Sequence, residues 1–207
     1  MFHVEHEPES AARIFGTGIE KARAYTAALV RDGETLGLLG PREYPRIWTR
    51  HVLNSAVVAE LVPAGATVAD VGSGAGLPGI PMAIAQPEAQ FVLIEPMERR
   101  SDWLKQQVEE LGLKNVRVLR NRAEEVGEVF DIVTARALKA MPQLLRMCVP
   151  MTKNGGEIIA LKGARAGEEI EEAKPLMKKL GVEKFDIVFT GEQFLDEPTR
   201  VVRTKLL

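Results

Sequence analysis

Short apolar runs alternate with helix-like segments from residue 67 onward, and this alternation constrains the fold more than any other feature of the chain. Five of the runs have the length and β-branched content of strands: TVADV, QFVLIE, VRVLR, FDIVTA and EIIALK. Helices are predicted between them, at about residues 81–85, 99–111 and 138–149. Strands that are apolar throughout and alternate with helices indicate a parallel sheet that is covered on both faces.

The two ends of the chain depart from this alternation. Residues 9–39 and 48–62 carry apolar side chains at helical spacing, so two helices are expected ahead of the first strand. After a helix at about 167–180, VEKFDIVF and TRVVRTKLL follow with no helix between them, which predicts a terminal antiparallel pair. We therefore expect an α/β, Rossmann-like fold with a mostly parallel seven-stranded sheet. The chain is interpreted as one domain, 1–207, with an N-terminal helical cap (1–64) and a core (65–207).

Composition excludes several classes of protein. A single cysteine in 207 residues cannot form an intramolecular disulfide, and no apolar run approaches the ~20 residues that a membrane span requires. The first ten residues lack a basic stretch followed by an apolar core, so no signal peptide is expected and a cytoplasmic setting is the default. The formal net charge of −2 argues against a protein that coats nucleic acid through bulk positive charge.

The charge is unevenly distributed along the chain. Residues 51–98 carry five acidic side chains and no Lys or Arg, which suits a cationic ligand. Residues 99–150 carry ten basic and seven acidic side chains. This basic segment is interpreted either as a solvated face or, if its arginines share a face, as local patches for a few phosphates of one structured RNA. Its key residues are Arg99, Arg100, Arg117, Arg120, Arg122, Arg136 and Lys139.

A glycine-rich loop, DVGSGAGLPG at residues 70–79, joins the first predicted strand to the next helix. Glycines there let a ligand approach the backbone at a helix N-terminus. One register, GxGxxG from Gly74, is the dinucleotide fingerprint, with Glu95 near the position that would hold a ribose hydroxyl. The other register, DxGxGxG from Asp70, fits better because its first glycine directly follows the strand.

The acidic surroundings of this loop favour S-adenosylmethionine, which carries a sulfonium and an ammonium and no phosphate. Asp70 and Gly74 are therefore candidate cofactor-binding residues. Glu95 ends the second strand, where its carboxylate can accept hydrogen bonds from both ribose hydroxyls or remain a solvated strand-end acid. Ala123 and Glu124 follow the third strand and either meet the adenine or form only a helix N-terminal turn.

The segment after the fourth strand distinguishes among methyl-transfer reactions. It reads TARA at 134–137 and lacks the Asn/Asp-Pro-Pro-aromatic box of amine methylation. Cys148 lies in an apolar helix and is interpreted as a buried small hydrophobe, which disfavours carbon methylation through a thiolate. A ring nitrogen such as guanine N7 has a lone pair and no proton, so methylating it requires positioning and no general base. Arg136 and Lys162 are candidates to contact guanine O6 or a phosphate, or are rim charges.

Polar side chains cluster at the start of the second predicted helix. Arg50 and His51 begin it, and Asn54 and Ser55 lie on the same face as His51. The cluster is predicted to line an opening above the cofactor, with local helix capping as the alternative. The candidate catalytic residues are Arg136, Lys162 and His51, and the candidate substrate-binding residues are Arg50, His51, Ser55, Arg136 and Lys162. His3 and His6 lack a third ligand, so no metal is expected.

The segments RHVLNS, DVGSGAGLPGIPMAI, IEP, NRAEE, TARAL and IALKG resemble the glucose-inhibited division protein B family, bacterial 16S ribosomal RNA guanine-N7 methyltransferases. The resemblance covers about residues 46–164, and LPGIP after the glycines is far more specific than the glycines alone. It implies a Rossmann-like enzyme that uses S-adenosylmethionine, with S-adenosylhomocysteine as product, on one guanine in the 530-loop region. It also implies cofactor contacts at Gly72, Leu77, Ala123, Glu124 and Arg136.

One position departs from the family pattern. The family often reads RHxxDS, whereas this chain has Asn54 in place of the acid, which leaves a hydrogen-bonding role and no catalytic carboxylate there. The expected partner is 16S rRNA or a small-subunit precursor, bound by a monomer without membrane or metal. Two alternatives are an NAD(P)-dependent oxidoreductase that uses the GxGxxG register, and a non-catalytic S-adenosylmethionine-binding ribosome assembly factor.

Overall fold

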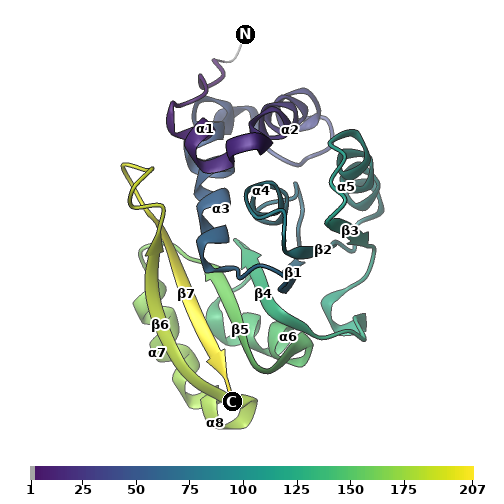
Figure 1. The fold of residues 1–207 in the computed structure, drawn as a ribbon. Coiled ribbons are helices and arrows are strands. Elements are labelled where there is room, and N and C mark those ends of the chain that lie inside the picture. The colour runs from purple at the N-terminus through teal and green to yellow at the C-terminus, as the bar shows by residue number, and fades with distance from the viewer. Residues whose placement is uncertain (1–2) are drawn as a thin grey trace.

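The structure is a computed structural model that describes residues 3–207 (Figure 1). Seven strands form one sheet in the order β3-β2-β1-β4-β5-β7-β6. β1 to β5 are parallel, and β7 is antiparallel to both β5 and β6. The predicted mostly parallel sheet and its terminal antiparallel pair are thus confirmed. The strands are β1 (Thr67–Val71), β2 (Gln90–Ile94), β3 (Val116–Leu119), β4 (Phe130–Arg136), β5 (Thr152–Leu161), β6 (Val182–Thr190) and β7 (Thr199–Leu206).

Side chains of the sheet alternate between two cores, one on each face. In β1, Val68 packs with the N-terminal cap, whereas Ala69 and Val71 pack on the opposite face. Burial of both faces explains why the central strands β1, β2 and β4 are mostly apolar, whereas β3 at the edge exposes Arg117. The helices that follow the strands are α4 (Gly79–Ala85) and α5 (Glu98–Glu110) on the cap side, and α6 (Met141–Cys148), α7 (Ala166–Ala173) and α8 (Met177–Leu180) (Figure 1).

The helix predicted over residues 9–39 is wrong as a single element. It divides into α1 (Ser10–Phe15) and α2 (Ile19–Asp32) around a 3₁₀ turn, η1 (Gly16–Gly18). A Cβ on Gly18 would lie 2.7 Å from Ile84 Cγ2 of α4, so glycine allows the cap to approach that helix closely. The break therefore serves the packing of the cap on the sheet's helical layer.

The segment predicted as a helix over 48–62 is helical, but its hydrogen bonding changes along its length. It begins as a π turn, η3 (Ile47–Leu53), continues as α3 (Asn54–Ala56) and ends as a 3₁₀ turn, η4 (Val57–Leu61). A 3₁₀ segment, η2 (Pro41–Arg46), precedes it. π turns are often found at functional sites.

Two later helices differ from their predicted bounds. α6 begins at Met141, because residues 137–140 form the loop after β4, in which Ala137 has a left-handed φ of 51°. The helix predicted over 167–180 divides at a 3₁₀ turn, η7 (Lys174–Leu176), because Pro175 lacks the N–H that a continuous helix requires. Within residues 3–207, no helix is long and apolar enough to cross a membrane.

The strand order reverses between β1 and β4, and this reversal positions the site. From β1 the chain proceeds outward to β2 and β3, and from β4 it proceeds the other way to β5. In open α/β sheets, ligands bind in the crevice at such a point, beyond the carboxyl ends of the strands. Asp70 of β1 is paired with Thr134 of β4, so the glycine loop and Arg136 leave the sheet side by side.

Candidate active site

Asp70, the penultimate residue of β1, has a fully buried carboxylate. Its Oδ2 accepts hydrogen bonds from the Ser73 hydroxyl at 2.6 Å and from the Gly79 backbone N–H at 2.9 Å. Its Oδ1 is buried and has no hydrogen-bond partner among the described residues. Burial raises the pKa of Asp70 to about 6, against the opposing effect of the two hydrogen bonds. One carboxylate oxygen thus shapes the glycine loop, and the other is buried without a partner among the described residues.

The same carboxylate disfavours a dinucleotide. A pyrophosphate binds the backbone N–H groups at the start of the helix that follows the loop. In this chain α4 begins at Gly79, and its N–H already donates to the anionic Asp70 side chain. A phosphate there would lose that donor and face a negative charge.

Two glycines of the loop serve different purposes. A Cβ on Gly74 would have only the Gly72 carbonyl oxygen nearby, at 3.8 Å, so the loop presents open backbone at this point. A Cβ on Gly79 would lie 2.6 Å from Asp70 Oδ2 and 2.3 Å from Leu93 Cδ2, so glycine is required for packing. Leu77, also in this loop, is partly buried against the cap-side core.

Glu95 follows β2 and is buried beside the loop. Its Oε2 accepts from the Gly74 N–H at 2.9 Å, and its Oε1 accepts from the Met97 N–H at 2.9 Å. A carboxylate oxygen has two lone-pair directions, so each oxygen retains one acceptor site. Beyond β3, the turn η5 (Ala123–Glu125) places Ala123 in the core and leaves the Glu124 side chain exposed. The predicted cofactor residues therefore lie along the carboxyl ends of β1, β2 and β3.

Arg136 ends β4 and is bound by the N-terminal cap. Its Nη1 donates to the His51 carbonyl oxygen at 3.2 Å and to Ser55 Oγ at 3.0 Å. Its Nη2 donates to the Arg50 carbonyl oxygen at 3.2 Å and to His51 Nδ1 at 2.7 Å. All four Nη hydrogens are thus used, so Arg136 retains only its Nε–H for another partner. The sequence analysis predicts that Arg136 contacts guanine O6 or a phosphate, and in this arrangement such a contact would have to use the Nε–H.

His51 lies between Arg136 and the cap residue Glu43. Its Nε2 is 2.8 Å from Glu43 Oε2, and its Nδ1 faces Arg136. Burial, followed by the charge of Arg136, lowers the pKa of His51 to about 4, so the ring is neutral at neutral pH. Glu43 is also bound by Arg46, and its pKa falls to about 2 through these hydrogen bonds. Both nitrogens of His51 are engaged, which is incompatible with a general base in this arrangement.

Lys162 forms an ion pair that is separate from the contacts of Arg136 and His51. It follows β5, and its Nζ is 2.7 Å from Glu169 Oε2 of α7 and 2.5 Å from the Lys139 carbonyl oxygen. Its side chain is only 10% exposed, so Lys162 is not a free rim charge. The two contacts join α7 to the loop after β4.

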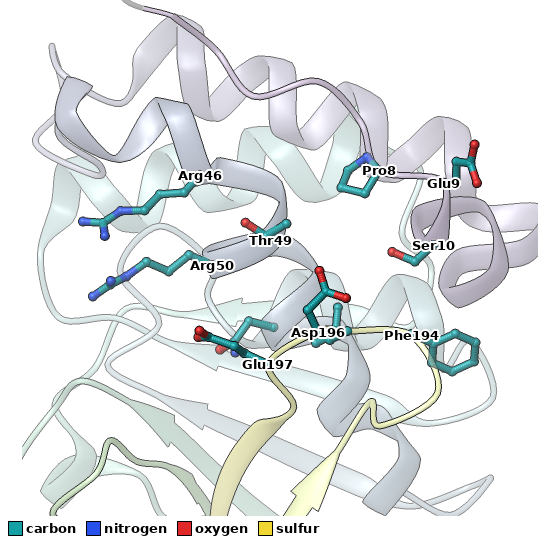
Figure 2. Close-up of a pocket in the computed structure, with 11 residues that line it drawn as sticks. Pro8, Glu9, Ser10, Arg46, Thr49, Arg50, Phe194, Asp196 and Glu197 are labelled. Carbon is teal, nitrogen blue, oxygen red and sulfur yellow. The ribbon is translucent and has the colours of Figure 1, made fainter.

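A groove passes along this edge of the molecule. One cavity of about 710 Å³ is lined by Arg136, Lys162 and the loop after β4, and a second of about 770 Å³ lies between the cap and the β6–β7 loop. Figure 2 shows Asp196 pointing into the second cavity, with Arg46 and Arg50 at one end and Phe194 at the other. Both cavities share Arg50, Asn54 and Glu197, so they meet below η3.

The protein itself engages part of the basic segment. Arg117 is paired with Glu128, Arg120 with Glu98, and Arg100 donates to the Gly37 carbonyl oxygen at 2.9 Å. Five of the key residues form no ion pair within residues 3–207. Arg100 and Arg136 instead donate to neutral acceptors of the cap, and three remain without such a partner: Arg99, Arg122 and Lys139. Each follows the carboxyl end of a parallel strand, so the three lie at the same edge of the sheet. The basic segment thus offers a smaller patch than its charge count indicates.

Cys148 is completely buried, as predicted, and burial raises the pKa of its thiol to about 12. We expect the native protein to resist alkylation by iodoacetamide at pH 8, because a thiolate and access are both required. Mass spectrometry of native and urea-unfolded protein would measure this. Rapid modification of the native chain would contradict the assignment.

The rings of His3 and His6 are 6.0 Å apart, and no cluster of three or more metal-binding side chains occurs in the described part of the chain.

Sequence reasoning missed three contributors to the site. Tyr25 of α2 donates its hydroxyl to the Ala75 carbonyl oxygen at 2.6 Å and so joins the cap to the glycine loop. Glu43 holds His51, and Glu169 holds Lys162. Tyr25 was visible only as part of an apolar helix face, and Glu43 and Glu169 carry no signal in a single sequence.

Comparisons with known proteins identify the family and the fold. The family model GidB, described as rRNA small subunit methyltransferase G, matches residues 18–198. The chain is 49% identical over 205 residues to Ribosomal RNA small subunit methyltransferase G of Clavibacter michiganensis subsp. michiganensis, which covers 98% of this chain and 97% of that protein. It is 50% identical to the protein of the same name from Leifsonia xyli subsp. xyli over 202 residues, 97% and 96% of the two chains. The fold is similar to that of M. jannaschii TYW2 in complex with AdoMet, with a TM-score of 0.59, 17% identity, and coverage of 77% and 76%.

Proposed function

Because the chain belongs to the GidB family of rRNA small subunit methyltransferases, we propose that it transfers a methyl group from S-adenosylmethionine to N7 of a specific guanine in 16S rRNA. The observation that carries this proposal is the crevice between β1 and β4. There an acid-lined glycine loop lies beside Arg136 and the groove. The enzyme is a methyltransferase of the Rossmann-like class.

The residues of the crevice fit S-adenosylmethionine. The unpartnered Asp70 Oδ1 can accept from an ammonium group, and the free lone pairs of Glu95 can accept from ribose hydroxyls. The open backbone at Gly74 gives a ligand close access to the loop. The predicted adenine contacts, Ala123 and Glu124, lie beyond the next strand. When bound, the cofactor supplies an electrophilic methyl group on its sulfonium.

Transfer to guanine N7 requires no side-chain base. The N7 lone pair forms the new C–N bond, the C–S bond breaks, and its electron pair returns to sulfur, so no proton moves. Both nitrogens of His51 are occupied and Cys148 is buried, which agrees with a reaction driven by orientation. The task of the protein is to hold the base and the methyl donor in line.

We assign the groove to the RNA. Arg50 lies where the two cavities meet, and its side chain is 58% exposed, so it can contact a phosphate. In this proposal the wall of the groove is shaped by Arg136, His51, Ser55 and Lys162.

We also propose that the protein works as a cytoplasmic monomer without a metal. We propose that it forms one domain, 1–207, whose first two residues lie outside the described part.

The expected result for the wild-type protein is a new N7-methylguanosine in small-subunit RNA. Purified protein would be incubated with S-adenosylmethionine and with either free 16S rRNA or small subunits from a strain that lacks the gene. Borohydride reduction and aniline cleavage, followed by primer extension, would locate the modified base. The two substrates distinguish free RNA from the assembled subunit, and omission of cofactor is the control. No cofactor-dependent cleavage on either substrate would overturn the proposal.

The alternatives predict different outcomes. An NAD(P)-dependent oxidoreductase would bind NAD(H) and not S-adenosylhomocysteine in calorimetry. A non-catalytic assembly factor would bind both S-adenosylhomocysteine and RNA without transferring a methyl group. The carboxylate at the start of α4 argues against the first alternative.

A further inference from the structure

Arg136 is a partly buried cation that makes no ion pair with a carboxylate within residues 3–207. Four neutral acceptors surround its Nη atoms: two carbonyl oxygens, the Ser55 hydroxyl and His51 Nδ1. A buried charge without a compensating carboxylate is costly. Two hydrogen bonds connect Arg136 to the carboxylate of Glu43 through the ring of His51: Arg136 contacts Nδ1, and Glu43 contacts Nε2.

The contacts fix the proton position on His51. Arginine nitrogens only donate, so His51 Nδ1 must be the unprotonated acceptor. A neutral ring then carries its proton on Nε2, which donates to Glu43 Oε2 at 2.8 Å. Glu43 can only accept, because Arg46 holds it bidentately at 2.9 and 3.1 Å and keeps it ionised. Without Glu43, the tautomer with hydrogen on Nδ1 would direct a proton at Arg136.

We propose that Glu43 is a positioning residue for methyl transfer, which acts through His51 to hold the Arg136 guanidinium at the carboxyl end of β4. This inference rests on the proposed function. Because four of the five guanidinium hydrogens are bound by the cap, the orientation of the fork determines where the remaining Nε–H points. Glu43 comes from η2, so a cap segment distant in sequence controls the geometry of the crevice.

The chain offers a matched control in Glu7. Like Glu43, it is a cap glutamate with a 27% exposed side chain and a bidentate arginine partner, Arg23, at 2.6 and 2.8 Å. Glu7 makes no hydrogen bond or ion pair with His51 or Arg136 within the described residues. Loss of Glu7 therefore reproduces the loss of a cap ion pair without breaking the path to Arg136. Glu43 also lies 3.7 Å from Arg50 Nε, and an effect through that pair would persist in a His51→Asn background.

The first experiment reads the tautomer directly, by nitrogen and carbon NMR of the histidine rings in the full chain. Only three histidines are present, so His51 can be assigned by its own substitution. We expect the Nε2–H form in the wild type and in Glu7→Ala, and a gain of the Nδ1–H form in Glu43→Ala. An Nδ1–H wild type, or an unchanged ring in Glu43→Ala, would overturn the proposal.

The second experiment measures transfer kinetics. Glu43→Ala is expected to lower kcat by about 10- to 100-fold with little change in KM, because misplacement of a positioned group costs that much. Glu43→Gln should recover most of the rate, since its amide oxygen still accepts from Nε2–H, and Glu7→Ala should match the wild type. In a His51→Asn background, Glu43→Ala should cost less than about twofold.

Independent, multiplicative effects of the two substitutions would refute the path through His51. So would an equal loss of rate in Glu7→Ala. An inactive wild-type protein would instead contradict the proposed function, while the NMR experiment would still test the role of Glu43.

Discussion

Replacing Arg136 with alanine is expected to lower the single-turnover rate of methyl transfer by at least about 100-fold. The substitution removes the positive charge at the end of β4 and every hydrogen bond that joins this strand to Arg50, His51 and Ser55. The cap then loses its attachment to the crevice on the Arg136 side. Transfer of a radiolabelled methyl group to small subunits, with enzyme in excess, measures the effect on chemistry apart from product release.

The same substitution should also destabilise the fold, because it leaves buried acceptors without a donor. We expect a loss of about 3 kcal/mol in the free energy of unfolding, equivalent to about 6–12 °C in Tm for a chain of this size. Arg136→Lys is the control, since it retains the charge but cannot satisfy four acceptors from one point. It should recover part of the stability and little of the rate. Retention of more than a tenth of the wild-type rate in Arg136→Ala would remove this residue from the machinery.

The central sheet was predictable because its signal is local. The central parallel strands are buried on both faces over most of their length, so their residues are mostly apolar, and TVADV or EIIALK shows this without knowledge of its neighbours. The positions of Asp70 and Glu95 at strand ends follow from the same pattern. Local signals also missed a break in a helix. The apolar periodicity over 9–39 continues through Gly16 and Gly18, where the structure divides the predicted helix.

The side-chain network was beyond reach of the sequence because its partners are distant. Arg136 and His51 are 85 positions apart in the sequence, and Arg120 forms an ion pair with Glu98 of another element. A count of charges along the chain cannot show such pairing, which is why the basic segment suggested a larger patch than the structure has. Glu43, in the segment PREYPR, resembles any exposed turn residue until the fold brings it to His51.

Replacing Asp70 with asparagine is expected to change how stability depends on pH. The pKa of Asp70 is raised from 3.8 to about 6 in the folded chain, so between these values the folded state binds more protons than the unfolded state. The free energy of unfolding therefore falls as the pH rises through this window, by about 3 kcal/mol in total. Asparagine does not titrate, so the variant should lack this fall.

The difference between the variant and the wild type isolates this effect from others. The amide nitrogen of asparagine would replace the unpartnered Oδ1 and add a cost that does not depend on pH. The quantity to measure is thus the change in the variant's relative stability between pH 4 and pH 7, from urea unfolding at each pH. A relative gain of about 2 kcal/mol for the variant is expected over this range, because part of the full change lies below pH 4. Parallel curves for the two proteins would show that Asp70 does not titrate as described.

His51 titrates in the opposite sense over the same range. Its pKa falls from 6.5 to about 4 on folding, so the unfolded state binds more protons and stability rises with pH through this window, again by about 3 kcal/mol. In the wild type the Asp70 and His51 effects nearly cancel between pH 4 and 6.5, while carboxylates with a lowered pKa, such as Glu43, add a rise in stability that ends slightly above pH 5. In Asp70→Asn the opposing Asp70 effect is absent, so stability should continue to rise with pH up to about 6.5.

This rise should coincide with weaker cofactor binding. The variant no longer presents an anionic acceptor at the Oδ1 position, so its affinity for S-adenosylhomocysteine in calorimetry at pH 7 should fall by about tenfold or more. The Asp70 carboxylate destabilises the ligand-free fold at neutral pH. Its negative charge is then favourable only when a cationic ligand lies beside it. Unchanged affinity in a variant with the expected pH dependence would separate the two roles and limit Asp70 to shaping the glycine loop.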